Sequence, residues 1–190
     1  NSLLKYFFIN KKFDQNIIEA YDQQLISLGI PIYTERNRFL KSFIPIFKKY
    51  YNNISSGDDM VNIKYNSNLN EGSFSEIISS SISKDRFVQY TTKGIHKDDL
   101  EFMIDGNKIK NFGSQGQQKS FLIALKLAQF HFIKQLADTT PILLLDDIFD
   151  KLDENRVSHI VGLVKDDNFG QIFISDTHAD RTENVVKNIH

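Results

Sequence analysis

The sequence predicts an α/β fold, in which helices pack on a parallel sheet, preceded by a mainly helical segment. After about Arg86, short apolar runs alternate with stretches whose apolar residues recur every three or four positions. That alternation of strand and helix is typical of a parallel sheet covered by helices. Before this point, helical spacing dominates. We therefore divide the chain into a helical arm-like domain at residues 1–85 and an α/β lobe at residues 86–190.

Composition limits the class of protein. The chain has 190 residues, of which 41% are hydrophobic and 25% charged, enough for one sizeable domain or a smaller one with an appendage. It contains no cysteine, which excludes disulfides and cysteine-based metal sites. No apolar run approaches the roughly 20 residues of a membrane helix, and we expect a cytoplasmic protein. The net charge of −1 does not indicate nucleic acid, although a local basic face remains compatible with it.

The arm-like domain is expected to contain a pair of helices. The first covers residues 14–28, with Asp14 as its N-cap, and Gly29 and Pro31 interrupt the pattern. The second should be kinked at Pro45. Its aromatic stripe, which we interpret as core, consists of Phe39, Phe43, Phe47 and Tyr50.

Shorter elements follow. Alternating apolar residues predict strands, and the Asp105-Gly106 pair predicts a tight hairpin turn. The continuous apolar run at residues 142–145 suits a strand buried on both faces. The expected elements are strands at 61–65, 87–91, 142–145 and 171–174, a hairpin at 100–110, and helices at 74–82, 117–136, 153–165 and 180–189.

The strand at residues 142–145 ends in two acidic residues, Asp146 and Asp147. Open α/β sheets bind ligands at the carboxyl ends of their strands. There, one aspartate can hold Mg²⁺ through water, and its neighbour can orient or deprotonate an attacking water. The alternative is a purely structural strand end, because many buried strands lead into an acidic helix cap.

A glycine-rich turn, residues 112–119, comes directly before the long helix. Ser114 stands at the helix N-terminus, where free N–H groups and the positive end of the dipole can bind an anion. Taken alone, the turn would be interpreted as an ordinary serine N-cap after glycine.

The order of these two elements resembles the ABC-type ATPases of chromosome and repair proteins, and among them it looks most like the RecF family. Residues 113–119 match the signature motif, 142–147 the Walker B strand and 150–153 the D-loop. Upstream, residues 94–100 are similar to the family's Gly-Pro-His-Arg-Asp-Asp-Leu segment, with Ile95 in place of proline.

The departures from the family pattern are also informative. No Gly-x-x-x-x-Gly-Lys-Ser/Thr loop occurs, which the resemblance explains if the chain is a C-terminal fragment lacking the Walker A loop. Asp147 stands where most ABC ATPases have glutamate, as in RecF. The switch residue is Asp176 by strict register, or His178 close to it.

The resemblance implies that ATP and Mg²⁺ are bound between two head domains. One protomer would contribute a P-loop, Asp146 as the metal residue and Asp147 as the catalytic carboxylate. The other would present its signature residues, Ser114, Gln115, Gly116 and Gln117. The D-loop residues Asp150 and Asp153 would lie at the dimer face, with Asp153 also expected to be a helix N-cap.

The implied function is that of an ATP-dependent DNA-binding protein in replication, recombinational repair and the SOS response. It would bind single-stranded and gapped DNA, assist RecA loading with RecO and RecR, and form an ATP-dependent homodimer. The candidate DNA-binding residues, whose alternative is a solvated helical face, are Lys11, Lys12, Arg36, Arg38, Lys48 and Lys49.

Two alternatives stay open. Another SMC-like or RecN-type ATPase would carry a long heptad coiled coil beside the head, which this sequence does not show. A non-catalytic interaction module would keep the fold without binding nucleotide. For the chain alone, we expect little or no ATP hydrolysis.

Overall fold

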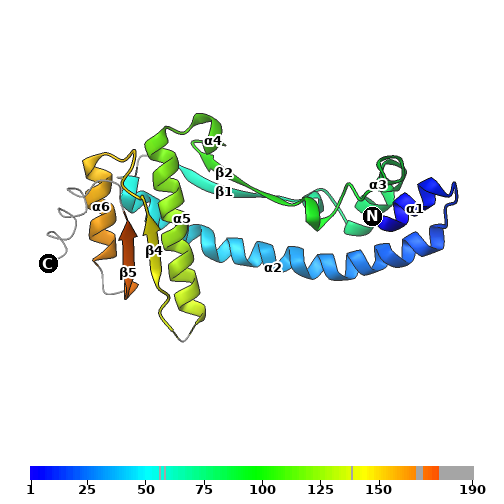
Figure 1. Cartoon of the computed structure of the whole chain (residues 1–190), viewed down its shortest axis with the longest axis horizontal. Helices are drawn as coiled ribbons and strands as arrows, with labels where there is room; N and C mark the ends of the chain where they lie inside the picture. The colour runs from blue at the N-terminus through cyan, green and yellow to red at the C-terminus, as the bar shows by residue number, and fades with distance from the viewer. Residues whose placement is uncertain (56, 58, 138, 166–168, 176–190) are drawn as a thin grey trace. The chain divides into compact units, whose positions relative to one another are not determined.

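The computed structural model describes residues 1–55, 57, 59–137, 139–165 and 169–175. The chain forms two compact units, each built from segments that are distant in the sequence (Figure 1). Unit 1 contains residues 1–40 and 64–101, and unit 2 contains residues 41–63 and 102–190. These units do not follow a single boundary after residue 85, and the division into a 1–85 arm and an 86–190 lobe stays a prediction.

The expected pair of helices in the arm was wrong, because one helix, α2, runs without a break over Gln15–Ser55. Asp14 begins it as predicted, its Oδ1 accepting the Ile17 N–H at 3.3 Å. Pro31 costs the helix one backbone hydrogen bond but has a φ that helices tolerate. Gly29 is explained by packing, since a Cβ there would lie 2.4 Å from Cε1 of the Phe74 ring. Packing against Phe74 therefore sustains the helix through Gly29 and Pro31, the two residues that predicted a break.

Unit 1 also contains the helices α1 (Ser2–Ile9) and α3 (Phe74–Val88) and the short 3₁₀ turns η1 (Asn68–Asn70) and η2 (Ile95–Lys97). The helix predicted at residues 74–82 is confirmed, and it extends six residues further. The strand predicted at 87–91 was wrong, because residues 87 and 88 belong to α3 and Gln89 ends the helix in the left-handed conformation with φ of 63°.

A three-stranded sheet has the order β1 (Val61–Asn66), β2 (Asp99–Ile104) and β3 (Asn107–Lys108). The predicted hairpin is confirmed: β2 and β3 are antiparallel, with Ile104 opposite Asn107. Its two turn residues, Asp105 and Gly106, both have positive φ, at 47° and 78°. Positive φ at both positions is the geometry of a type I′ turn, for which an Asp-Gly pair is well suited.

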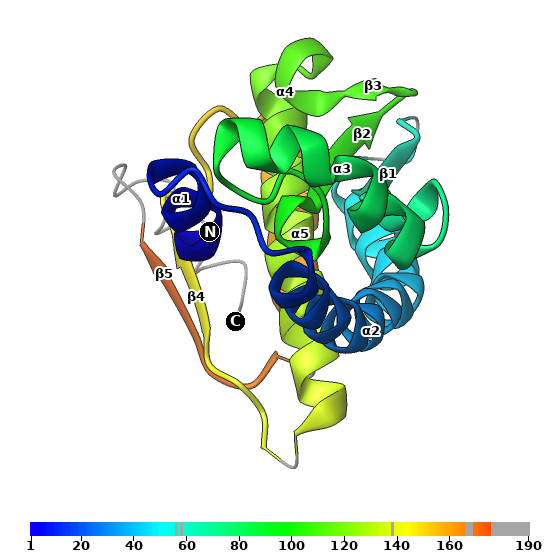
Figure 2. The same cartoon turned by 90° about the vertical axis from the view of Figure 1, so that its right-hand side faces the viewer.

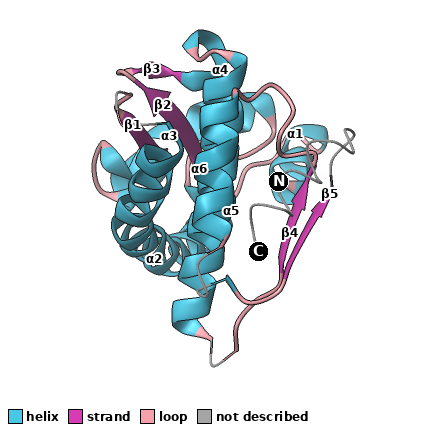
Figure 3. Cartoon of the chain, turned by 90° about the vertical axis from the view of Figure 1, so that its left-hand side faces the viewer, coloured by secondary structure: helices cyan, strands magenta, loops and turns pink. Residues whose placement is uncertain are grey.

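Unit 2 contains α4 (Ile109–Phe112), the long helix α5 (Gln115–Leu136), α6 (Glu154–Val164) and two strands. The strands β4 (Leu143–Asp146) and β5 (Ile172–Ser175) lie side by side and are parallel, with Asp146 opposite Ser175 (Figures 2 and 3). The predicted helices at 117–136 and 153–165 and the strand at 171–174 are confirmed. The expected helix at 180–189 lies outside the described residues.

Strand β4 is buried on one face only, which corrects the prediction of burial on both. Leu143 and Leu145 are buried, whereas Leu144 on the opposite face is 65% exposed. Phe173 of β5 is similarly 54% exposed. Within the described residues the continuous apolar run thus has one packed face and one apolar face open to solvent.

Of the helices in the described ranges, none is both long and apolar enough to cross a membrane.

Candidate functional site

The glycine-rich turn forms a rigid N-terminus for α5. Ser114 Oγ accepts the Gln117 N–H at 3.2 Å, and Gln117 Oε1 accepts the Ser114 N–H at 2.8 Å. This reciprocal pair is a capping box, which confirms Ser114 as the N-cap. Gly113 is required by close approach, because a Cβ there would lie 2.9 Å from the Ile109 carbonyl oxygen. The side chain of Ser114 stays exposed at the end of the helix.

The first turn of α5 also contacts α6 and the segment that precedes it. A Cβ at Gly116 would lie 2.4 Å from Arg156 Nη1 and 3.4 Å from the Lys151 carbonyl oxygen. Glycine therefore lets the first turn of α5 approach the D-loop within one chain. The structure brings the signature and D-loop residues together, as their order in the sequence alone could not show.

Each aspartate of the acidic pair has its own environment at the end of β4. Asp146 is exposed, and its Oδ1 accepts the hydroxyl of Ser175 from the neighbouring strand. Asp147 has a φ of 48°, a conformation that costs a non-glycine residue about 1 kcal/mol. Two contacts hold its backbone there: its N–H donates to the Ser175 carbonyl oxygen at 3.0 Å, and its own carbonyl oxygen accepts Lys119 Nζ at 2.6 Å.

Asp147 has a polar atom that the fold does not satisfy. Its Oδ1 is buried and has no hydrogen-bond partner among the described residues. A buried carboxylate oxygen without a donor is costly unless a water, an ion or a ligand completes its bonding. Exposed Asp146 beside it is an oxygen ligand of the type that Mg²⁺ prefers. The pair therefore fits a Mg²⁺–nucleotide site.

Metal clusters made wholly of protein ligands are not found in the described part of the chain, where no group of three His, Cys, Asp or Glu residues comes together. A Mg²⁺ ion that works on nucleotides needs only one or two carboxylates, because phosphates and waters complete its coordination.

The D-loop begins helix α6. Asp153 Oδ1 accepts the Arg156 N–H at 2.9 Å, which confirms Asp153 as the N-cap. Its Oδ2 lies 3.5 Å from Arg156 Nε, so the same carboxylate orients the guanidinium that lies beside Gly116. Asp150 lies 4.0 Å from Lys151 Nζ, and both side chains are about half exposed. The predicted role of both aspartates at a dimer face stays a prediction.

A third contact to the signature turn comes from Asp59. Its Oδ1 accepts Gln117 Nε2 at 3.0 Å, and its Oδ2 accepts the Tyr51 hydroxyl at 2.6 Å. Burial of the Tyr51 phenol, together with the hydrogen bond to Asp59, raises the pKa of Tyr51 well above its ordinary value. Asp59 thus links a buried residue of α2 to the capping box.

In unit 1, the segment at residues 94–100 is held against α2 by a buried carboxylate. Asp98, whose side chain is 3% exposed, accepts Arg36 Nη1 at 2.8 Å and also the Tyr65 hydroxyl. The same Arg36 nitrogen donates to the Ile95 carbonyl oxygen at 2.9 Å. Burial and the bond to Asp98 raise the pKa of Tyr65. Gly94, with φ of 118°, adopts a conformation that favours glycine.

The six candidate DNA-binding residues are exposed, and they are divided between the two units. Lys11, Lys12, Arg36 and Arg38 belong to unit 1, and Lys48 and Lys49 belong to unit 2. Of these, Arg36 is engaged with Asp98. The DNA-binding role stays a prediction for all six. The candidate switch residues, Asp176 and His178, lie outside the described residues.

Sequence reasoning missed four residues that shape the site. Ser175 could have been found, because neighbouring parallel strands end at the same edge and it directly follows the predicted strand at 171–174. Lys119 lies within the signature motif at 113–119, but its contact with Asp147 is not readable from that motif. Asp59 and Arg156 reach the signature turn because segments far apart in the sequence come together in unit 2.

Proteins named RecF are similar to this chain over its whole length. A "DNA replication and repair protein RecF" from Flavobacterium johnsoniae is 53% identical over 190 residues, covering 100% of this chain and 53% of that protein. The corresponding protein of Phocaeicola vulgatus is 45% identical, with 50% of its length covered. The chain thus spans about half the length of the curated relatives it matches. No family model matches it.

Solved structures agree with this relationship. The recombination mediator protein RecF with ATP, in the RecFOR pathway, is 26% identical, with a TM-score of 0.77 over 94% of this chain and 49% of that one. An Smc head domain from Pyrococcus yayanosii has a TM-score of 0.53 at 18% identity over 90% of this chain and 29% of that one, which supports the fold alone. The resemblance to RecF and the fold class of an ABC-type ATPase lobe with a helical region are confirmed.

Proposed function

We propose that this chain, related to RecF over its whole length, is the C-terminal half of an ATP-dependent DNA repair protein. The full-length protein would consist of this chain together with the half that its relatives carry in addition. That other half would supply the phosphate-binding loop, since no such loop occurs in these 190 residues.

One observation supports the proposal most strongly. An exposed acidic strand end, with a buried carboxylate oxygen that lacks a donor, shares one compact unit with a rigidly capped helix N-terminus. The acidic strand end has the chemistry of a Mg²⁺–nucleotide site, and the helix N-terminus has that of a phosphate site. The D-loop packs against this helix N-terminus at Gly116.

The roles of the residues follow from their environments. Exposed Asp146, oriented by Ser175, would hold Mg²⁺ through water. Mg²⁺ supplies positive charge that offsets the charge of the phosphates. Asp147 is held in place by Lys119 and β5. Its unsatisfied oxygen would orient the attacking water or accept a proton from it. The shorter side chain of aspartate should make it a slower base than the glutamate of most ABC ATPases.

The signature turn would act on a second copy of the protein. The free N–H groups of the first turn of α5 and the Ser114 hydroxyl would bind the γ-phosphate held by the partner subunit. Because the capping box and Asp59 fix this turn before ATP arrives, little ordering would be required on dimerisation. ATP binding would then join two subunits, and hydrolysis would release them.

The biological role is proposed from the relationship alone. Relatives are named for DNA replication and repair, and the RecF neighbours for the RecFOR pathway. The full-length protein would bind single-stranded and gapped DNA, act with RecO and RecR to assist RecA, and work in the cytoplasm. Lys11, Lys12, Arg38, Lys48 and Lys49 remain candidates for contacts with DNA phosphates.

Steady-state ATP hydrolysis by the full-length protein in the presence of gapped DNA tests the proposal. Asp147→Asn should lower kcat by at least about 100-fold, the scale of losing a general base. The matched control is Glu19→Gln, an exposed carboxylate of unit 1 that accepts a hydrogen bond from Gln15, and its rate should equal that of wild type. Turnover in Asp147→Asn at the wild-type rate would contradict the catalytic role of Asp147, and no ATP hydrolysis by wild type would support a non-catalytic module.

A further inference from the structure

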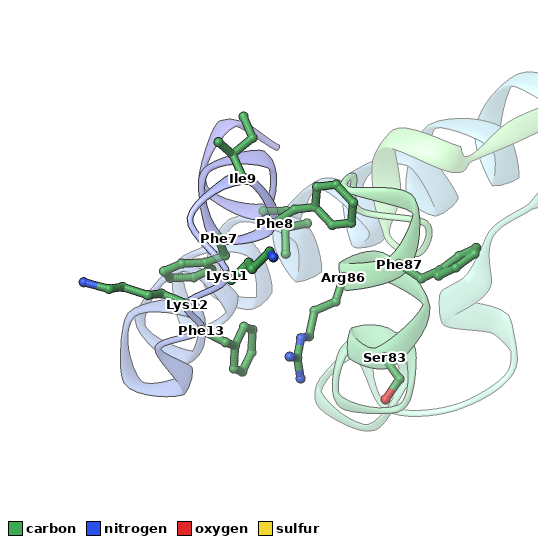
Figure 4. A pocket seen from close by; sticks show the side chains of 10 residues that line it. Phe7, Phe8, Ile9, Lys11, Lys12, Phe13, Ser83, Arg86 and Phe87 are labelled. Atoms are coloured by element: carbon green, nitrogen blue, oxygen red, sulfur yellow. The ribbon is translucent and has the colours of Figure 1, made fainter.

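Unit 1 contains a pocket of about 720 Å³ between α1 and α3, far in sequence from the signature and Walker B residues (Figure 4). Its inner side consists of Leu4 and Phe7, which belong to the small core of this unit, and of partly buried Phe13, which packs against them. Its exposed side includes Phe8, at 60% exposure, and Phe87, at 83%. Large aromatic side chains exposed around a concave apolar surface are typical of a binding site.

The charged residues that line this pocket are all cationic. They are Lys11, Lys12 and Arg86, and no carboxylate is among the lining residues. The guanidinium of Arg86 lies 3.8 Å from the centroid of the Phe13 ring, which fixes one positive charge at the apolar wall (Figure 4). The acidic residue of the adjoining pocket, Asp14, is engaged in capping α2. The pocket is therefore complementary to a ligand that is both apolar and negatively charged.

The backbone of Lys11 has a conformation that glycine adopts at a lower free-energy cost. It follows α1 with a φ of 50°, and its N–H donates to the Phe8 carbonyl oxygen at 3.3 Å. The next N–H, of Lys12, donates to the Phe7 carbonyl oxygen at 3.1 Å. These two bonds form a Schellman motif, whose left-handed residue is usually glycine. A lysine in this conformation lowers the stability of the fold by about 1 kcal/mol relative to glycine. Its side chain adds a positive charge to the pocket.

We infer that this pocket docks an acidic amphipathic segment of a partner protein. A bulky apolar side chain of the segment would enter the cavity, and flanking carboxylates would pair with Lys11, Lys12 and Arg86. Phe7 and Phe13 pack against each other, and Arg86 lies over Phe13, so the rings of this pocket available for base stacking are the exposed Phe8 and Phe87. A protein segment is favoured over nucleic acid because the concave apolar surface can bury a bulky apolar side chain.

The inference is independent of the proposed ATPase, since every lining residue belongs to unit 1 and the nucleotide residues belong to unit 2. Fluorescence anisotropy of the full-length protein tests it with a short fluorescein-labelled peptide in which aspartates flank a Leu-Phe pair. Two matched peptides serve as controls, one with asparagine in place of aspartate and one with Ser-Ser in place of Leu-Phe. Labelled oligothymidylate is the nucleic-acid probe.

Wild type should bind the acidic peptide, and each control peptide should bind at least about tenfold more weakly. Lys12→Glu and Phe87→Ser, both at exposed positions, should weaken peptide binding by about tenfold or more. Lys41→Glu and Leu28→Ser are the matched controls, because these side chains are exposed and do not line the pocket, and both should bind as wild type does.

Three results would overturn the inference. The first is no binding of the acidic peptide by wild type, as when another part of the full-length protein covers the pocket. The second is equal binding by all four variants. The third is loss of oligothymidylate binding in Lys12→Glu and Phe87→Ser without any peptide binding, which would make the pocket a nucleic-acid face.

Discussion

Asp59 joins two parts of the chain that the sequence gives no reason to connect. One of its oxygens accepts the buried hydroxyl of Tyr51, and the other accepts the amide of Gln117 in the capping box. The signature turn is thus braced by α2, in addition to its own reciprocal hydrogen bonds.

This bracing predicts a specific alkaline sensitivity. Burial and Asp59 raise the pKa of Tyr51 in the folded protein, so its phenol stays protonated there when the unfolded chain ionises. The stabilisation is complete below the ordinary tyrosine pKa of about 10 and is lost as pH rises above it. Urea unfolding of the full-length protein should therefore weaken more between pH 8 and about 10.5 in wild type than in Tyr51→Phe.

The lysines titrate in the same range in both proteins, so only the difference between the two pH profiles is informative. Parallel loss of stability in wild type and Tyr51→Phe would show that the phenol does not resist ionisation.

Among single residues, those whose role depends only on neighbouring positions in the chain could be predicted from the sequence. Ser114 and Asp153 were identified as N-caps from their place before a helix, and Asp105-Gly106 as a tight turn. The bracing residues were not, because a hydrogen bond such as that between Asp59 and Gln117 depends on packing between elements, which local sequence does not encode.

Gly29 in α2 and Gly162 in α6 are both helical, and the same substitution at each should have opposite effects on stability. Gly162 in α6 has open space around a built Cβ, so Gly162→Ala should stabilise the protein by about 0.5–1 kcal/mol. Gly29 in α2 faces the buried Phe74 ring at 2.4 Å, so Gly29→Ala should destabilise it by about 1–3 kcal/mol. Urea unfolding of the two variants measures both effects.

Comparing the two variants tests whether close packing against Phe74 explains the glycine at position 29. Stabilisation by Gly29→Ala would mean that the Phe74 ring moves away freely, and that close packing does not explain this glycine.

Among the elements, most were predicted close to their observed positions, and the exceptions are the long helix α2 and the strand expected at 87–91. Helix α5 and the strands β1, β4 and β5 were expected within a few residues of their observed bounds. The break expected at Gly29 and Pro31 was wrong because contact with Phe74 sustains α2 through that segment. The short strand expected at 87–91 was wrong because α3 continues to Val88.

At the scale of the whole molecule, the two-stranded sheet has one apolar face that is exposed to solvent. Ile142, Leu144 and Phe173 form an apolar surface that this chain leaves open within its described residues. We propose that the other half of the full-length protein covers it. A continuous apolar run normally indicates a strand buried on both faces, which is why the sequence predicted burial that this chain does not provide.

The same substitution should then act differently in the two proteins. In the 190-residue chain alone, Leu144→Ser should reduce self-association, seen as a shift toward the monomer in sedimentation velocity. In the full-length protein it should lower the free energy of unfolding by about 2–4 kcal/mol, the scale of losing a buried leucine. A small effect on the free energy of unfolding of the full-length protein would mean that the other half does not cover this face.

The signature turn of one subunit and the acidic strand end of another are proposed to share one ATP. The most direct test is sedimentation velocity of the full-length protein with and without ATP, comparing wild type, Asp147→Asn and Ser114→Arg. We expect ATP to dimerise wild type and Asp147→Asn, the latter persistently because hydrolysis is slow, whereas Ser114→Arg should stay monomeric. Dimerisation of Ser114→Arg as strong as that of wild type would contradict the shared site, because the exposed end of α5 would then not be part of it.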